Sequence, residues 1–142
     1  MHSSIRFSVL LFLFLDPVTP WTTLIISGTI YCRLGGPFQY RQKVFESDSP
    51  WGWNELVYDG EVVTGARAHV YNVTVTLHSD SGTPNFEIFT EFRHNCNTRG
   101  QNSNHNLKVS YDLGDWKVKP GFFHVKANFD LTDKGVYSPE PI

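Results

Sequence analysis

The sequence of 142 residues is poor in charge and shows almost no excess of either sign. Only 18% of the residues are charged, and 12 Lys and Arg stand against 14 Asp and Glu, which gives a formal net charge of −2. A nucleic-acid-binding domain normally carries a basic patch and a high isoelectric point, and an acidic tail needs a run of like charges. Neither is found, so we do not expect nucleic acid as a partner.

Residues typical of helices are also scarce. There is one methionine, whereas aromatic residues make up 15% of the chain, with 11 Phe, 6 Tyr and 4 Trp. Aromatic and β-branched residues are enriched in strands, and this many aromatics are not expected of a disordered chain. The length fits one domain of ordinary size. The composition therefore predicts a single small β-rich domain with a packed core.

No apolar run reaches the roughly 20 residues that a membrane-spanning helix needs. The run Phe7–Leu15 follows the basic residue Arg6 and ends at Asp16-Pro17. A basic start followed by about 7–15 apolar residues is the form of a secretory signal peptide. We therefore predict a signal peptide at residues 1–20 and a secreted, extracellular domain at residues 21–142. A buried strand or helix at the domain edge is the alternative, and without an A-x-A site the cleavage position stays open.

The chain has only two cysteines, Cys32 and Cys96. Two cysteines alone are too few for a zinc site, and in an oxidising compartment an even pair normally forms a disulfide. In the cytosol two free buried thiols would be the alternative. Both cysteines fall on the apolar face of their segments, which fits a bridge buried between strands. We predict a disulfide between Cys32 and Cys96.

Apolar and polar residues alternate along most of the remaining chain. This period of two is typical of antiparallel strands with one buried face. Turns rich in Gly, Pro, Asn and Ser separate the strands, and a short helix at Trp53–Tyr58 is compatible with the pattern. The predicted fold is an all-β antiparallel sandwich of about seven strands, with a barrel as the alternative. The alternating segments are Leu24–Cys32, His69–Leu77, Phe86–Cys96, Leu107–Leu113 and Phe123–Leu131, with shorter runs at Lys43–Phe45 and Glu61–Thr64.

Three motifs in a fixed order resemble those of a known family. They are Ser27-Gly28-Thr29-Ile30-Tyr31-Cys32, Val44-Phe45-Glu46-Ser47-Asp48 and His94-Asn95-Cys96-Asn97. With the signal peptide, they resemble the G-T-x-x-C, V-x-x-x-D and H-x-C motifs of the nematode transthyretin-like family. The resemblance covers roughly Leu24 to Leu131, although the segment Ser49–Asn54 and the cysteine-free loop Asn97–Asn106 depart from the usual pattern.

This resemblance implies a secreted transthyretin/prealbumin-like sandwich of two antiparallel sheets without a known catalytic activity. Some family members are thought to bridge extracellular partners or to bind lipid head groups. The enzymes of this fold, the 5-hydroxyisourate hydrolases, end in Tyr-Arg-Gly-Ser. This chain ends in Tyr137-Ser138-Pro139-Glu140-Pro141-Ile142, which argues against the hydrolase.

Surface features suggest where a partner binds. Asn72-Val73-Thr74 is an N-glycosylation sequon on the polar face of its strand, so we predict a glycoprotein, with an unmodified asparagine as the alternative. Trp51 and Trp53 lie in a loop, where aromatics either contact a partner or fold down to cap the sandwich. The polar loop Asn97–Asn106 is a further candidate, because loops at the end of a rigid scaffold often bind.

Patterns that carry catalysis or bind metals are missing from the sequence. There is no G-x-S-x-G elbow and no H-E-x-x-H motif, so we predict no catalytic residue, no metal and no cofactor. His94 shares an apolar face with Phe92 and Cys96 and is expected to be a satisfied buried histidine. Lys117, Lys119 and Lys126 either form a patch for anionic lipid or are ordinary solubilising charges.

The function expected from these features is that of a secreted non-enzymatic binding protein. It would recognise or bridge an extracellular protein or lipid partner, as a monomer or weak homo-oligomer, through its loops or an edge strand. The alternative is a carrier of a small hydrophobic ligand, which needs a dimer-of-dimers channel lined by the outer face of a sheet. A hydrolase of the hydroxyisourate type is the third hypothesis.

Overall fold

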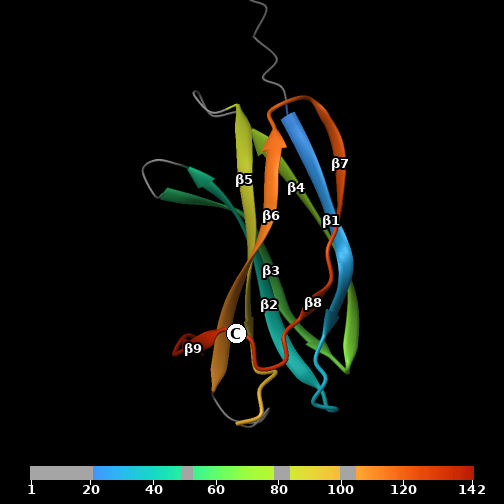
Figure 1. Ribbon diagram of the computed structural model, residues 1–142, viewed down its shortest axis with the longest axis vertical. Helices are drawn as coiled ribbons and strands as arrows, with labels where there is room; N and C mark the ends of the chain where they lie inside the picture. Colours follow the sequence, from blue (N-terminus) through green and yellow to red (C-terminus); the bar gives the residue numbers. More distant parts are fainter. Residues whose placement is uncertain (1–20, 49–52, 79–83, 100–104) are drawn as a thin grey trace, which may run out of the picture.

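The computed structural model describes residues 21–48, 53–78, 84–99 and 105–142, and the predicted signal peptide at residues 1–20 lies outside these ranges. None of the described residues is helical, and none lies in a helix that could cross a membrane. The described residues form nine strands (Figure 1): β1 Trp21–Tyr31, β2 Phe38–Asp48, β3 Trp53–Gly65, β4 Ala68–His78, β5 Asn85–His94, β6 Asn106–Lys117, β7 Gly121–Lys126, β8 Phe129–Asp130 and β9 Val136–Ser138.

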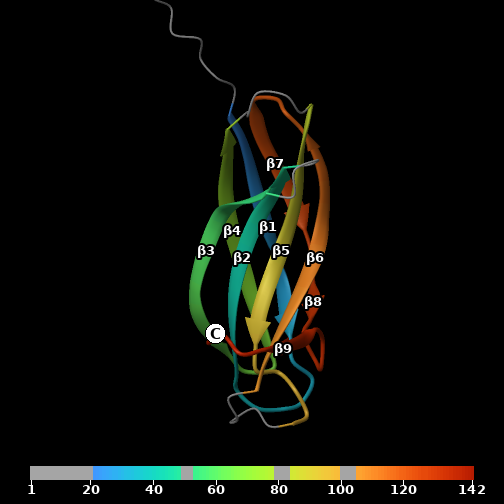
Figure 2. The same ribbon diagram turned by 90° about the vertical axis from the view of Figure 1, so that its left-hand side faces the viewer.

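The strands form two sheets that pack face to face (Figure 2). Sheet A has the order β4-β1-β7, with the short strand β8 also paired to β1. Sheet B has the order β3-β2-β5-β6-β9. Seven longer strands and two short ones therefore confirm the predicted all-β sandwich and exclude the barrel.

The core lies between the two sheets and follows the alternation in the sequence. On β4, Tyr71, Val73, Val75 and Leu77 are at most 5% exposed, while the residues between them face solvent. The remaining core side chains come from both sheets, with Leu24, Ile26 and Ile30 on β1 and Phe86, Ile88 and Phe92 on β5. The apolar face of each predicted long strand is thus its inward face, buried at most positions of β1, β4 and β5 and half-buried along most of β6 and β7.

One pairing departs from the antiparallel expectation. β1 pairs with β4 in antiparallel fashion, but with β7 and β8 in parallel. Alternation predicts which face of a strand is buried, but it carries no information on the direction of the neighbouring strand. Sheet A is therefore a mixed sheet, whereas sheet B is antiparallel throughout.

Strands β2 and β3 are longer than the sequence predicted. On β2 the buried positions include Gln42 and Glu46, which interrupt the apolar pattern and conceal the ends of the strand. On β3 the register with β2 shifts twice, so its alternation is broken. The segment Trp53–Tyr58, whose sequence also allowed a short helix, is the first part of β3.

The predicted last strand, Phe123–Leu131, is divided into β7 and β8 where the chain crosses Gly28. The amide of Ala127 donates a hydrogen bond to the carbonyl of Ser27 at 3.0 Å. A Cβ atom on Gly28 would lie 1.9 Å from the carbonyl oxygen of Ala127. The glycine of the first motif therefore permits a close approach of two backbones.

Gly28→Ala is expected to destabilise the domain by about 2 kcal/mol or more, because backbone must move to admit the methyl group. Urea unfolding followed by tryptophan fluorescence measures the change. Gly114→Ala is the matched control, since a Cβ atom there meets no atom within 4 Å and only the positive φ of 89° opposes it. Equal losses in the two variants would contradict the role assigned to Gly28.

Candidate functional site

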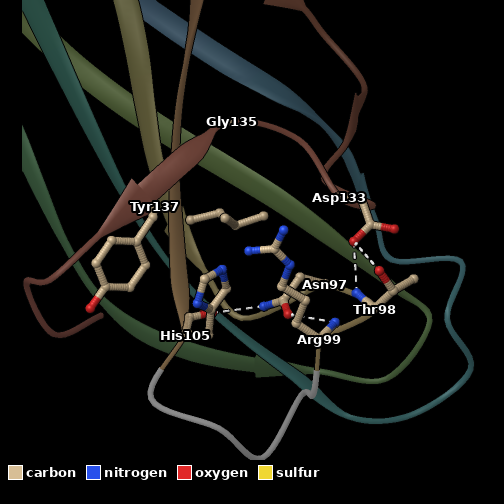
Figure 3. Close-up of a pocket in the computed structure, with 8 residues that line it drawn as sticks. Asn97, Thr98, Arg99, His105, Asp133, Gly135 and Tyr137 are labelled. Carbon is tan, nitrogen blue, oxygen red and sulfur yellow. Dashed lines mark hydrogen bonds between the residues drawn. The ribbon is translucent and has the colours of Figure 1, made fainter.

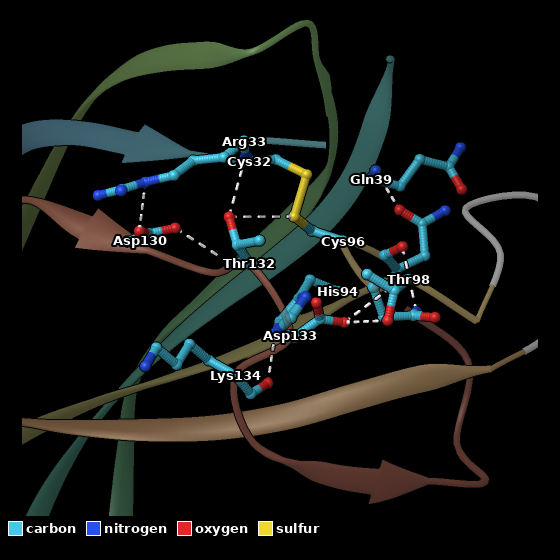
Figure 4. The surroundings of a disulfide bond; sticks show 12 residues. Cys32, Arg33, Gln39, His94, Cys96, Thr98, Asp130, Thr132, Asp133 and Lys134 are labelled. Atoms are coloured by element: carbon cyan, nitrogen blue, oxygen red, sulfur yellow. Dashed lines mark hydrogen bonds and ion pairs between the residues drawn. A yellow bond between two sulfur atoms is a disulfide. The ribbon is translucent and has the colours of Figure 1, made fainter. Parts of the chain in front are cut away.

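The predicted disulfide joins the two sheets at one end of the sandwich (Figure 4). Cys32 follows β1 of sheet A and Cys96 follows β5 of sheet B, with their Cα atoms 5.8 Å apart. Both side chains are fully buried. The structure confirms the pairing and shows that it fixes the start of the loop that follows Cys96.

His94 lies beside this disulfide and is 0% exposed. Its Nε2–H donates a hydrogen bond to the carbonyl of Lys134 at 3.0 Å, which leaves Nδ1 as an acceptor without a hydrogen-bond partner among the described residues. Burial lowers the pKa of His94 to about 4, although the Lys134 carbonyl and the charge of Asp133 oppose the shift. The predicted burial is confirmed, but only one ring nitrogen is satisfied.

Asp133 clamps the loop after Cys96 to the segment between β8 and β9. Its carboxylate accepts hydrogen bonds from the amide and the hydroxyl of Thr98, at 2.7 and 3.1 Å. Its amide donates to the carbonyl of Cys96 at 3.0 Å. Asp133 has a φ of 54°, a left-handed conformation that aspartate tolerates better than most residues. The clamp holds two segments together that are far apart in the sequence.

Asn97 orders the same loop from inside. Its side-chain nitrogen Nδ2 donates a hydrogen bond to the backbone carbonyl of His105 at 2.7 Å, and its Oδ1 accepts one from the backbone amide of Arg99 at 3.1 Å. The side chain is almost fully buried. The side chain of Asn97 thus links Arg99 to His105.

These segments enclose a cavity of about 350 Å³, which we call the terminal cleft (Figure 3). The ring of His105 stacks on Tyr137 with 4.9 Å between the ring centroids, and the guanidinium of Arg99 projects into the opening. Guanidinium, imidazole and phenol groups suit the recognition of an acidic group, and the Asp133 carboxylate in the same lining is already engaged by the amide and hydroxyl of Thr98. The lining residues are Asn97, Thr98, Arg99, His105, Leu107, Asp133, Gly135 and Tyr137.

A second cavity, of about 360 Å³, opens on the side of the sandwich where β3 and β4 are the edge strands. We call it the lateral cleft. In its wall the hydroxyl of Tyr40 lies 2.5 Å from Nδ1 of His69. Burial, and next the neighbouring Tyr58, raise the pKa of Tyr40 to about 12, so this phenol stays protonated beside the histidine. The cleft is lined by Tyr40 and Gln42 of β2, by Tyr58, Gly60, Glu61 and Val63 of β3, and by His69–Val73 of β4.

The tryptophans predicted for partner contact are only partly placed. Trp53 begins β3 and is 75% exposed, so it does not cap the sandwich. Trp51 lies outside the described residues. Trp53 lines neither cleft and stays a candidate contact residue by exposure alone.

Asn72 is exposed on β4, opposite Ser27 of β1, and its carboxamide is on the solvent face as predicted.

The three lysines considered as a patch for anionic lipid do not lie side by side. Lys117 ends β6 and Lys126 ends β7, and the five steps along β7 alone span about 17 Å. Lys119 instead lies over the ring of Phe123, with its Nζ 4.9 Å from the centroid.

The sequence did not reveal the contributions of Asp133 and Tyr137 to the terminal cleft, nor the contact between Tyr40 and His69. Within the described ranges, no group of three or more His, Cys, Asp or Glu side chains is placed to hold a metal ion.

The chain matches no family model, and no match was found among the curated proteins or the solved structures.

Proposed function

We propose that this chain is a secreted, non-enzymatic binding protein of the transthyretin-like type that recognises an extracellular protein or lipid partner. The observation that carries the proposal is the terminal cleft, in which Arg99 and His105 face an opening held by the Cys32–Cys96 bond and the Asp133 clamp. Donors on a rigid frame bind with little loss of conformational freedom. An acidic group on the partner, a carboxylate or a phosphate, fits these donors.

Affinity capture tests this proposal. The secreted chain is immobilised, exposed to extracellular fluid of the source organism, and compared with Arg99→Gln and His105→Gln variants. At least one captured species is expected to depend on Arg99 or His105 and to be released by salt, because charge-assisted hydrogen bonds at an exposed site are screened. The same set of captured species on all three proteins would contradict binding at the terminal cleft.

The carrier of a small hydrophobic ligand is a second candidate, because the outer face of sheet A has an apolar groove of about 430 Å³. Its walls include Trp21 and Phe122, which are 61% and 75% exposed. A channel of the transthyretin kind needs several copies of the chain around this face. Light scattering after size exclusion decides between the candidates, since a monomer is incompatible with the channel.

We also propose that Asn72 carries N-linked carbohydrate, because its exposed side chain lies on the solvent face of β4. Glycosidase treatment of the chain secreted from eukaryotic cells is expected to raise its electrophoretic mobility. Asn72→Gln should abolish the change, whereas Thr74→Ser keeps the sequon and should preserve it. Unchanged mobility of the wild-type chain after treatment would show that Asn72 is unmodified.

A further inference from the structure

The lateral cleft lies where sheet A ends one strand short of sheet B. The contact between Tyr40 and His69 places β4 over β2, and sheet B continues beyond β2 with β3. Figure 2 shows β3 as the outermost strand on this side. The inward-facing Tyr58 and Val63 of β3 therefore line the cleft, and no described strand of sheet A covers them.

The edge of β4 that pairs with no described strand presents a row of backbone groups beside this cleft. The amide of Cys32 donates to the carbonyl of Arg67, and the register between β1 and β4 then continues without a shift from Tyr31↔Ala68 to Trp21↔His78. Residues of an antiparallel pair alternate between hydrogen-bonded and non-hydrogen-bonded positions. The odd-numbered residues of β4 thus bond to β1. The N–H and C=O groups of Val70, Asn72, Thr74 and Thr76 point away from it.

Strand β4 lacks the features that usually prevent an edge from pairing. Its sequence from Ala68 to His78 contains no proline and no Lys, Arg, Asp or Glu, and its register with β1 contains no bulge. Natural edge strands are commonly blocked by prolines, charges or bulges, because an open edge is a template for another strand. An eleven-residue edge without them is suited to accept one.

A bulge in β3 gives the cleft its charge. The register changes from Arg41↔Val62 to Lys43↔Asp59, so Gln42 of β2 faces the two residues Gly60 and Glu61. Such bulges redirect side chains, and here Glu61 lines the cleft. Among the lining residues that the structure describes, Glu61 is the only Asp, Glu, Lys or Arg, so a basic group on the ligand would complement the cleft.

We infer that the lateral cleft binds an extended peptide segment of another protein as an added strand on β4, with a Lys or Arg of the peptide paired to Glu61. Main-chain hydrogen bonds to the even-numbered residues of β4 hold the strand, and alternate side chains face Tyr58 and Val63. This surface is separate from the terminal cleft, so the two proposals stand or fall independently.

Antiparallel pairing of two copies of the chain through β4 would produce a clash. If two copies paired through β4, the β3 strand of each would extend beneath the β4 of the other. In each copy, β2 already lies below β4, and β3 lies next to β2 in sheet B. The β3 strand of one copy would therefore occupy the same space as the β2 strand of the other. A single strand without a second sheet beneath it avoids this clash.

A library of random ten-residue peptides displayed on phage tests the inference, with the full oxidised chain as bait. Each bait is also made in the Asn72→Gln background, because carbohydrate on Asn72 would lie beside the edge. Enriched peptides are expected to carry one basic residue among alternating β-branched or apolar residues. Val70→Pro should weaken their binding about tenfold, because it removes an edge N–H and places a ring in the path of the strand.

Val70→Thr is the matched control, since it keeps the N–H and should bind as the wild type does. Glu61→Gln should weaken basic peptides but not uncharged ones, and it keeps the inference testable if Val70→Pro fails to fold. Amide exchange by NMR should show new protection at Val70, Asn72, Thr74 and Thr76 on binding. The inference is overturned if no peptide is enriched, or if enriched peptides bind the Val70→Pro and Glu61→Gln variants as tightly as the wild type. A wild-type dimer that Val70→Pro converts to a monomer would equally overturn it, and would assign the edge to a second copy.

Discussion

Replacing Cys32 and Cys96 by alanine is expected to lower the free energy of unfolding by about 4 kcal/mol. The two residues are 64 apart in sequence, and opening so long a loop restores much conformational freedom to the unfolded chain. Because a single domain is commonly stable by only about 5–15 kcal/mol, this loss is a large fraction of the total stability. Urea unfolding at pH 7 measures the loss.

The single variants Cys32→Ala and Cys96→Ala serve as controls for this result. Each breaks the same bond, so each should lose nearly as much stability as the double variant. A double variant within about 1 kcal/mol of the wild type would show that the bond constrains the unfolded chain far less than its loop length implies.

Lowering the pH from 7 to 4 is expected to reduce stability by about 3 kcal/mol through His94 alone. The pKa of His94 is about 4 in the folded chain, against an ordinary value of 6.5 for a solvent-exposed histidine. Between these values the unfolded chain binds the proton and the folded chain does not, so stability falls as the pH falls. The contribution is present in full above pH 6.5 and is lost by about pH 4.

His94→Gln isolates this effect, because glutamine does not titrate yet keeps an N–H donor for the carbonyl of Lys134. Asp130, whose pKa is lowered mainly by its hydrogen bond from Thr132, also loses stabilisation in acid, but it does so in both proteins. Urea unfolding at several pH values should therefore give a shallower pH dependence for His94→Gln. Parallel curves for the two proteins would contradict a titrating His94.

The long strands were predictable because burial on one face leaves a period of two in the sequence. Tyr71–Leu77 of β4 and the apolar inward positions of β5 follow this rule. The rule failed where an inward position is polar, as at Gln42 and Glu46, and where bulges in β3 move side chains to the other face. The division of the last strand followed from a backbone contact at Gly28, which no local pattern records.

The candidate sites were less predictable than the fold. Their geometry depends on contacts between distant residues, such as Thr98 with Asp133 and Tyr40 with His69. The polar composition of the loop Asn97–Asn106 predicts a binding loop, but the segment after β8 that contacts this loop has no comparable composition. The disulfide was the exception, because two cysteines on inward faces leave only one pairing.

The central proposal is that this chain is a secreted, disulfide-bonded domain. The decisive measurement is the intact mass of the chain recovered from the medium of eukaryotic cells. We expect a chain that has lost its signal segment and begins near residue 21. After removal of carbohydrate it should be about two mass units lighter before reduction than after it. A chain retained in the cells with residues 1–20 still attached, and with the same mass before and after reduction, would contradict the account.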